Sequence, residues 1–307
     1  MADLDDHHPF SVARAGAASG ELDTPEQPRP LDELTRARAL LAAQAVVEGH
    51  TEPPRVFDPD DLPPVRAAEA GAQLWSLRVD PDEGVIGTLR RIDAIHALVA
   101  ACPEDLRLAH STAEMAHAVN CGRVAVLLGP VSWSALGGSL AALRAYHALG
   151  VRAVNLTRFD GFAREAVREM NRLGLIVDLA GADPETIRRT LALTRAPVLL
   201  TRADPQELPD DVLRLLGENG GVCMLPVTDD VQTTADAFDR VRTLAGPHCV
   251  GLSHTTSPPD GYAPLVAELL HRAWPAPDLV ALAHTNPTRA LRETEFLSRT
   301  TRHRRAA

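Results

Sequence analysis

Eight short apolar segments, most of them separated by amphipathic stretches, constrain the fold of this chain more than any other feature. Each has the length and the apolar content of a buried β-strand. Alternating strands and helices are typical of a parallel sheet covered by helices, and near-continuous apolar runs are typical of strands buried on both faces. The predicted strands are Ala45–Val47, Gln73–Val79, Val124–Leu128, Ala153–Leu156, Leu175–Leu179, Val198–Thr201, Gly221–Val227 and Cys249–Ser253.

Strand–helix units repeated eight times over about 250 residues predict an α/β fold, a closed (β/α)8 TIM barrel forming a single domain. A doubly wound open sheet is the alternative. It favours a glycine-rich phosphate loop after an early strand, and the sequence contains no GxGxxG or GxxxxGK[ST] pattern. A helix from Leu31 with Asp32 as its cap is expected first, and helices between Tyr262 and Glu295 are expected last. The helices predicted between strands are Gly138–Ala148, Phe162–Arg172, Pro184–Leu193, Asp210–Leu216 and Thr234–Leu244.

The composition agrees with one domain and two tails. The chain has 307 residues, 45% of them hydrophobic, which suffices for one large core. Residues 1–30 are rich in Pro, Gly, Asp and Glu and lack periodicity, so they predict a disordered tail. The barrel is expected over residues 31–297, and residues 298–307 predict a solvated basic tail.

The net charge and the hydropathy of the chain limit the classes of molecule that it is expected to bind. The formal net charge of -10 argues against nucleic acid, which requires a basic face. No apolar run approaches the roughly 18 residues of a membrane span, and the acidic N-terminus lacks the features of a signal peptide. We therefore expect a cytoplasmic protein without membrane contact. Its four scattered cysteines, with no CxxC pair, are expected to be buried free thiols.

In a barrel of this kind, functional side chains lie at the carboxyl ends of the strands. The first strand is followed by Glu48–Glu52, in which His50 and Glu52 are expected to face the same way because side chains alternate along a strand. A histidine beside a carboxylate is half of a metal site. An exposed turn is the other interpretation. His254, after the eighth strand, could complete a site of two histidines and one carboxylate.

Asp178 ends the fifth predicted strand and is expected to be buried. A buried carboxylate is costly unless it is paired. Arg152, Arg158 and Arg202 are the candidate ion-pair partners, and a general-base role is the alternative. The sequence contains no G-x-S-x-G nucleophile elbow.

Nine stretches spread over residues 34–295 carry a distinctive set of residues at characteristic spacings: Ala39–Ala42, Val46–His50, Gly71–Ser76, Gly137–Arg144, Leu149–Thr157, Val167–Gly174, Ile176–Leu179, Leu208–Leu213 and Gly220–Met224. In this order they resemble the membrane (renal) dipeptidase family of zinc peptidases. The resemblance implies a (β/α)8 barrel of the metallo-dependent-hydrolase type. It also implies dipeptide hydrolysis by two zinc ions bridged by a carboxylate.

The residues that this mechanism requires are mostly replaced. The family's Asp-Gly-His-Asn-Asp motif stands here as Glu48–Glu52, so the resemblance leaves His50 and Glu52 as the remnant of a metal site. The position of the bridging glutamate falls on Val131. The other ligand positions, two histidines and an aspartate, fall on Gly181, Arg202 and Thr255.

These replacements imply an inactive homologue. Two adjacent zinc ions need a bridging anion, which Val131 cannot supply, and Arg202 carries a permanent positive charge. We therefore expect a pseudoenzyme that acts as a binding or partner subunit and needs no cofactor. The family resemblance implies a homodimer, or a heterodimer with an active dipeptidase relative.

Two other functions remain open. One is a metal-dependent dipeptidase or hydrolase with a reduced zinc site built from His50 and Glu52. The other is a repurposed barrel in which Arg158, Arg202 and His254 bind a small anionic or peptide-like ligand, since guanidinium groups suit carboxylates and phosphates.

Overall fold

The computed structural model describes residues 32–53, 70–80, 82–253 and 261–306. The described strands form one parallel sheet of ten, in the order β3-β4-β2-β1-β10-β9-β8-β7-β6-β5. The strands are β1 (Val46–Thr51), β2 (Ala70–Trp75), β3 (Leu106–Leu108), β4 (Val124–Leu128), β5 (Val131–Ser132), β6 (Ala153–Asn155), β7 (Ile176–Asp178), β8 (Leu199–Thr201), β9 (Val222–Pro226) and β10 (Val250–Ser253).

The sheet closes on itself between β4 and the start of β6. Leu128 at the end of β4 forms a parallel bridge with Val151, and the Arg152 backbone N–H donates to the Leu128 carbonyl at 2.8 Å. This bridge completes a ring of β1, β2, β4 and β6 to β10, with β3 beside β4 and β5 beside β6. The prediction of a (β/α)8 barrel is confirmed, and the open doubly wound sheet is excluded.

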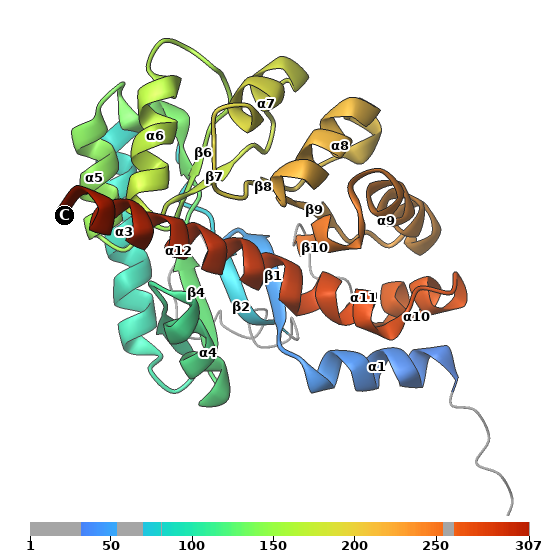
Figure 1. The fold of residues 1–307 in the computed structure, drawn as a ribbon. Helices are drawn as coiled ribbons and strands as arrows, with labels where there is room; N and C mark the ends of the chain where they lie inside the picture. Colours follow the sequence, from blue (N-terminus) through green and yellow to red (C-terminus); the bar gives the residue numbers. More distant parts are fainter. Residues whose placement is uncertain (1–31, 54–69, 81, 254–260, 307) are drawn as a thin grey trace, which may run out of the picture. The chain divides into compact units, whose positions relative to one another are not determined.

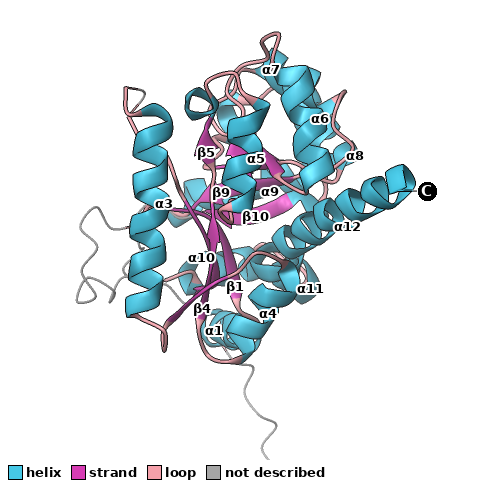
Figure 2. Cartoon of the chain, turned by 90° about the vertical axis from the view of Figure 1, so that its left-hand side faces the viewer, coloured by secondary structure: helices cyan, strands magenta, loops and turns pink. Residues whose placement is uncertain are grey.

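Helices surround the strands, as Figures 1 and 2 show. The outer face of the sheet and the inner faces of the helices share the larger hydrophobic cluster, in which Leu143, Val167 and Phe238 are fully buried. The helices are α1 (Glu33–Ala43), α3 (Gly84–Ala101), α4 (Thr112–Asn120), α5 (Leu140–Ala148), α6 (Ala163–Leu173), α7 (Pro184–Leu191), α8 (Asp210–Asn219), α9 (Val231–Ala245), α10 (Ala263–His271), α11 (Ala276–Val280) and α12 (Asn286–Ala306), with a π-helical turn at Ala281–Thr285.

The interior of the barrel belongs to a second hydrophobic cluster, in which strand residues such as Ala72, Leu127 and Ile176 pack with Met115 of α4 and Ala290 of α12. Met224 of β9 reaches across this interior toward β1. A Cβ at Gly49 would overlap the Met224 sulfur, so glycine is the residue that fits at the centre of β1. The barrel is thus a filled core, and its functional surface is confined to its rim.

Each of the eight predicted strands is present, and the five predicted inter-strand helices are too. The main difference among the strands is β2, which begins at Ala70 and ends at Trp75 instead of covering Gln73–Val79. The chain leaves the sheet at Ser76, whose N–H donates to the Thr51 carbonyl, and the next N–H donates to Pro130. Residues 78–80 consequently lie at the rim.

The chain ends differ from each other in the structure. The predicted tail of residues 1–30 lies outside the described residues, whereas α12 continues through residue 297 to Ala306. Asp32 caps α1 as predicted, accepting from the Thr35 N–H at 2.8 Å. The cysteines are free, but the expectation of burial is wrong for Cys121, which is exposed at the end of α4.

Among the described helices, none has the length and apolarity to cross a membrane.

Candidate functional site

The carboxyl end of β1 supplies three acidic or basic side chains with different roles. The side chain of Glu48, in the middle of β1, is buried. It accepts from Gln73 Nε2 at 2.8 Å, from Thr51 Oγ1 at 3.1 Å and from the Tyr262 hydroxyl. Burial raises the pKa of Glu48 to about 7, although these hydrogen bonds act in the opposite direction. Glu48 therefore holds β1 against β2 and α10.

His50 and Glu52 lie together, as the strand periodicity predicts. The His50 Nε2 atom is 3.0 Å from Glu52 Oε1, and His50 is only 2% exposed whereas the Glu52 side chain is 53% exposed. The pair thus reaches from the barrel interior to solvent. His50 Nδ1 is buried and has no hydrogen-bond partner in the part of the chain that the structure describes.

Two arginines approach the same carboxylate. Arg91 of α3 places Nη2 3.9 Å from Glu52 Oε2, and Arg202 places Nη1 4.0 Å from Glu52 Oε1. The His50 hydrogen bond lowers the pKa of Glu52 most. The charges of His50, Arg91 and Arg202 add to this effect, while burial opposes it. Arg202 adopts the left-handed backbone conformation (φ 53°) directly after β8.

Asp178, the last residue of β7, is fully buried, but its hydrogen-bond partners are neutral. Thr201 donates to it through both N–H and Oγ1, each at 3.0 Å, and Asn155 Nδ2 donates at 3.1 Å. Burial raises the pKa of Asp178. The predicted ion pair with an arginine is therefore wrong for the described residues, because hydroxyl and amide donors from the neighbouring strands satisfy this carboxyl group.

The three candidate arginines of that prediction lie elsewhere. Arg152 donates to the carbonyls of His110, His147 and Val151; Arg158 is 73% exposed with Nε 3.3 Å from Asp160; and Arg202 lies at Glu52.

The positions that the resemblance assigns to lost ligands are distributed around the rim. Val131 is fully buried in β5, Gly181 follows β7 with φ +71°, and Arg202 follows β8. Thr255 and His254 lie outside the described residues, so the expected anion-binding set of Arg158, Arg202 and His254 is not tested as a set.

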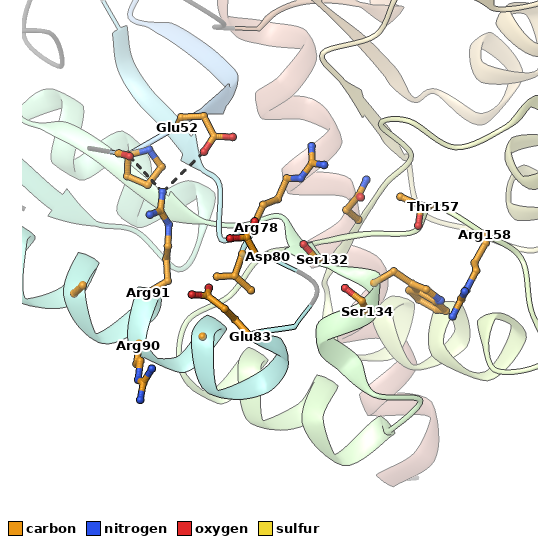
Figure 3. Close-up of a pocket in the computed structure, with 16 residues that line it drawn as sticks. Glu52, Arg78, Asp80, Glu83, Arg90, Arg91, Ser132, Ser134, Thr157 and Arg158 are labelled. Carbon is orange, nitrogen blue, oxygen red and sulfur yellow. Dashed lines mark hydrogen bonds and ion pairs between the residues drawn. The ribbon is translucent and has the colours of Figure 1, made fainter. Parts of the chain in front are cut away.

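A cavity of about 930 Å³ opens at the rim beside Glu52 (Figure 3). The segment after β2 and the start of α3 form one wall, and the residues after β4 and β6 form the other. Its polar lining includes Arg78, Asp80, Glu83, Ser132, Ser134, Thr157 and Arg158.

Among these lining residues, Arg158 was predicted as a candidate anion-binding residue, whereas Arg78, Asp80 and Glu83 were not predicted. Arg78 lies inside the predicted strand Gln73–Val79 and Asp80 lies directly after it, whereas β2 ends at Trp75, so the predicted strand end was too late to place these residues at the rim.

The described residues do not fit a two-zinc centre. Nowhere among them do three or more His, Cys, Asp or Glu side chains converge in a way that could hold a metal ion. Glu52, the exposed carboxylate of the remnant, already has His50 and two guanidinium groups as neighbours. His50 Nδ1, which has no partner among the described residues, is a potential ligand atom, yet a single histidine and a single carboxylate make at most half of a site.

Comparisons with known proteins agree with the fold. A family model described as membrane dipeptidase, peptidase family M19, matches residues 34–305. Human dipeptidase 3 is 29% identical over 346 residues, spanning 89% of this chain and 70% of that protein. Dipeptidase aclJ of Aspergillus oryzae is 32% identical over 308 residues, spanning 81% and 73%.

A solved structure shows the same architecture. The crystal structure of the probable dipeptidase PvdM from Pseudomonas aeruginosa superposes with a TM-score of 0.79 at 15% identity, covering 86% of this chain and 99% of that one.

Proposed function

The chain belongs to the membrane dipeptidase family, and from that premise we propose that it is a member without two-zinc dipeptidase activity that uses the rim of its barrel for binding. The observation that carries the proposal is the environment of Glu52. Its carboxylate is hydrogen-bonded by His50 and lies within 4.0 Å of both Arg91 and Arg202.

The positive charge of the arginines beside Glu52 disfavours the binding of a metal ion there. Arginine stays protonated at every accessible pH, so Arg202 keeps its charge where a divalent cation would have to approach Glu52. A zinc ion would also have to replace the His50 hydrogen bond. Two zinc ions would repel each other without a bridging anion, and Val131, the residue at the expected bridging position, is an alkyl side chain buried in β5.

The test is metal analysis combined with a hydrolysis assay. We expect the purified full chain to contain far less than one zinc ion per molecule. We also expect it to leave a panel of dipeptides uncleaved when zinc is added, while an active member of the family serves as positive control. Two zinc ions per chain, together with dipeptide hydrolysis that a chelator abolishes, would contradict the proposal.

A reduced metal site is the second candidate, because His50 and Glu52 are juxtaposed and His50 Nδ1 has no partner among the described residues. This candidate predicts one zinc ion per chain, lost in His50→Ala. His117→Ala, which changes an exposed histidine on α4, is the matched control and should leave the zinc content unchanged. The dimer and the cytoplasmic location remain predictions.

A further inference from the structure

The cavity beside Glu52 contains charged groups that the preceding proposal does not use. We propose that it binds a small hydroxylated acid, anchored at Arg78 through the carboxylate or phosphate group of the ligand. This inference rests on the proposed function only in assigning the rim to binding instead of hydrolysis.

Arg78 is the anchor because its charge is available. It is exposed, and in the part of the chain that the structure describes its guanidinium has no hydrogen-bond or ion-pair partner. The backbone N–H of Arg78 donates to Ser76 Oγ at 3.3 Å, and this hydrogen bond fixes the turn in which the chain leaves β2. Figure 3 shows its side chain extending into the space between Glu52 and Thr157. A planar guanidinium donates two parallel hydrogen bonds to a carboxylate or a phosphate.

The other arginines of the cavity are committed or directed elsewhere. Arg91 donates to the Pro53 carbonyl at 3.3 Å and lies near Glu52, and Arg158 is paired with Asp160. Arg90 points away from the labelled polar groups in Figure 3. The cavity therefore offers one strong position for an anionic group.

The remaining polar lining suits hydroxyl groups. Ser132, Ser134 and Thr157 provide hydroxyls on the wall opposite α3, and these can both donate and accept. Asp80 and Glu83 are exposed carboxylates without an ion pair among the described residues. They repel a second anionic group but accept hydrogen bonds from ligand hydroxyls. A cavity of about 930 Å³ has room for a body of six or more carbons.

The experiment is calorimetric titration of the full chain at neutral pH. Gluconate and glucose 6-phosphate are the acidic probes and distinguish a carboxylate from a phosphate. Glucose is the neutral control, and alanyl-alanine is the zwitterionic control. We expect at least one acidic probe to bind, with glucose and alanyl-alanine binding about tenfold more weakly or not at all.

Two variants separate the anchor from the general charge of the surface. Arg78→Gln should weaken binding of the acidic probe about tenfold. Arg164→Gln removes the same charge from an exposed position on α6 that is not among the residues lining the cavity, and it should leave the affinity unchanged. Circular dichroism establishes that both variants are folded, and Ser132→Ala gives an independent change in the opposite wall that should also weaken binding.

Three results would overturn the inference: no binding of either acid, equal loss of affinity in the two arginine variants, or tighter binding of alanyl-alanine than of both acids. Hydrolysis of dipeptides by a zinc-loaded chain would instead overturn the proposed function, and it would leave the acid-binding result intact. The two failures are thus distinguishable.

Discussion

Glu52 shows how neighbouring charges decide the chemistry of one residue. In the described structure its carboxylate lies within 4.0 Å of His50, Arg91 and Arg202, so three groups that can carry a positive charge surround it. Asp178 is the opposite case, since neutral donors surround it and burial raises its pKa. Two carboxyl groups of one barrel rim therefore differ in charge balance because their neighbours differ.

Glu169 gives a prediction at the residue scale. It is 10% exposed and accepts from Arg144 Nε at 2.5 Å and from Arg172 Nε at 2.7 Å, which joins α5 to α6. The Arg172 hydrogen bond, followed by that of Arg144, lowers the pKa of Glu169 to about 2. Glu169→Gln should reduce the free energy of unfolding at pH 7 by about 1–2 kcal/mol, measured by urea denaturation.

The pH dependence of this effect has a definite sign. Between pH 4.5 and about 2 the unfolded chain binds a proton at Glu169 that the folded chain does not. The stabilisation is complete above this window and is lost as the pH falls through it, so the difference between the parent and the variant should shrink there. Glu165→Gln, an exposed change on the same helix, is the control. A difference that grew with acidity would contradict the assignment.

At the scale of elements, β1 depends on one contact across the barrel interior. A Cβ at Gly49 would overlap the Met224 sulfur and would also approach its Cβ. The position of the strand, and with it the position of His50 and Glu52, is therefore set by the packing of β1 against β9.

Gly49→Ala tests this contact. Overpacking should lower the free energy of unfolding by about 1–3 kcal/mol, measured by chemical denaturation. In a Met224→Ala background the added methyl group enters the space that the thioether leaves, so the same change should cost less than about 1 kcal/mol. Equal costs in both backgrounds would show that the overlap with Met224 is not the cause.

At the scale of the whole barrel, α12 joins distant parts of the chain. In Figure 1 it crosses in front of the strands, and it contacts β1, β9, β10, α4 and α6. Asn286 Nδ2 donates to the Pro247 and Val250 carbonyls, both at 2.8 Å, and Glu295 accepts from the N–H and the hydroxyl of Thr112. These contacts connect the last helix with the start of β10 and with α4.

Paired substitutions on α12 measure this connection. Glu295→Gln weakens a charge-assisted cap of α4 and should lower the free energy of unfolding by about 1–2 kcal/mol. Glu293→Gln breaks only an exposed pair with Arg289 and should change it by less than about 0.5 kcal/mol. Thermal denaturation compares the two, and equal effects would mean that α12 does not stabilise the barrel through Thr112.

The fold was predictable because its elements are locally encoded. Apolar runs give the strands their burial on both faces, and the helix cap at Asp32 forms within four residues. No helix was predicted over residues 84–101, where the structure has α3. Val85, Ile86 and Leu89 of this helix are exposed, so its apolar residues do not follow a clear amphipathic pattern. The early end of β2 depends on hydrogen bonds to Thr51 and Pro130, residues that are distant in the sequence.

The site was predictable only in part. The sequence by itself determined the barrel, the family and the pairing of His50 with Glu52, because each depends on periodicity or on the order of motifs along the chain. Only the tertiary structure decided that Arg91 and Arg202 meet at Glu52 and that Thr201 and Asn155 satisfy Asp178. Likewise, the exit of the chain from β2 brings Arg78 to the rim. The physical reason is that charge balance depends on distances between side chains from different strands, which the closure of the barrel sets.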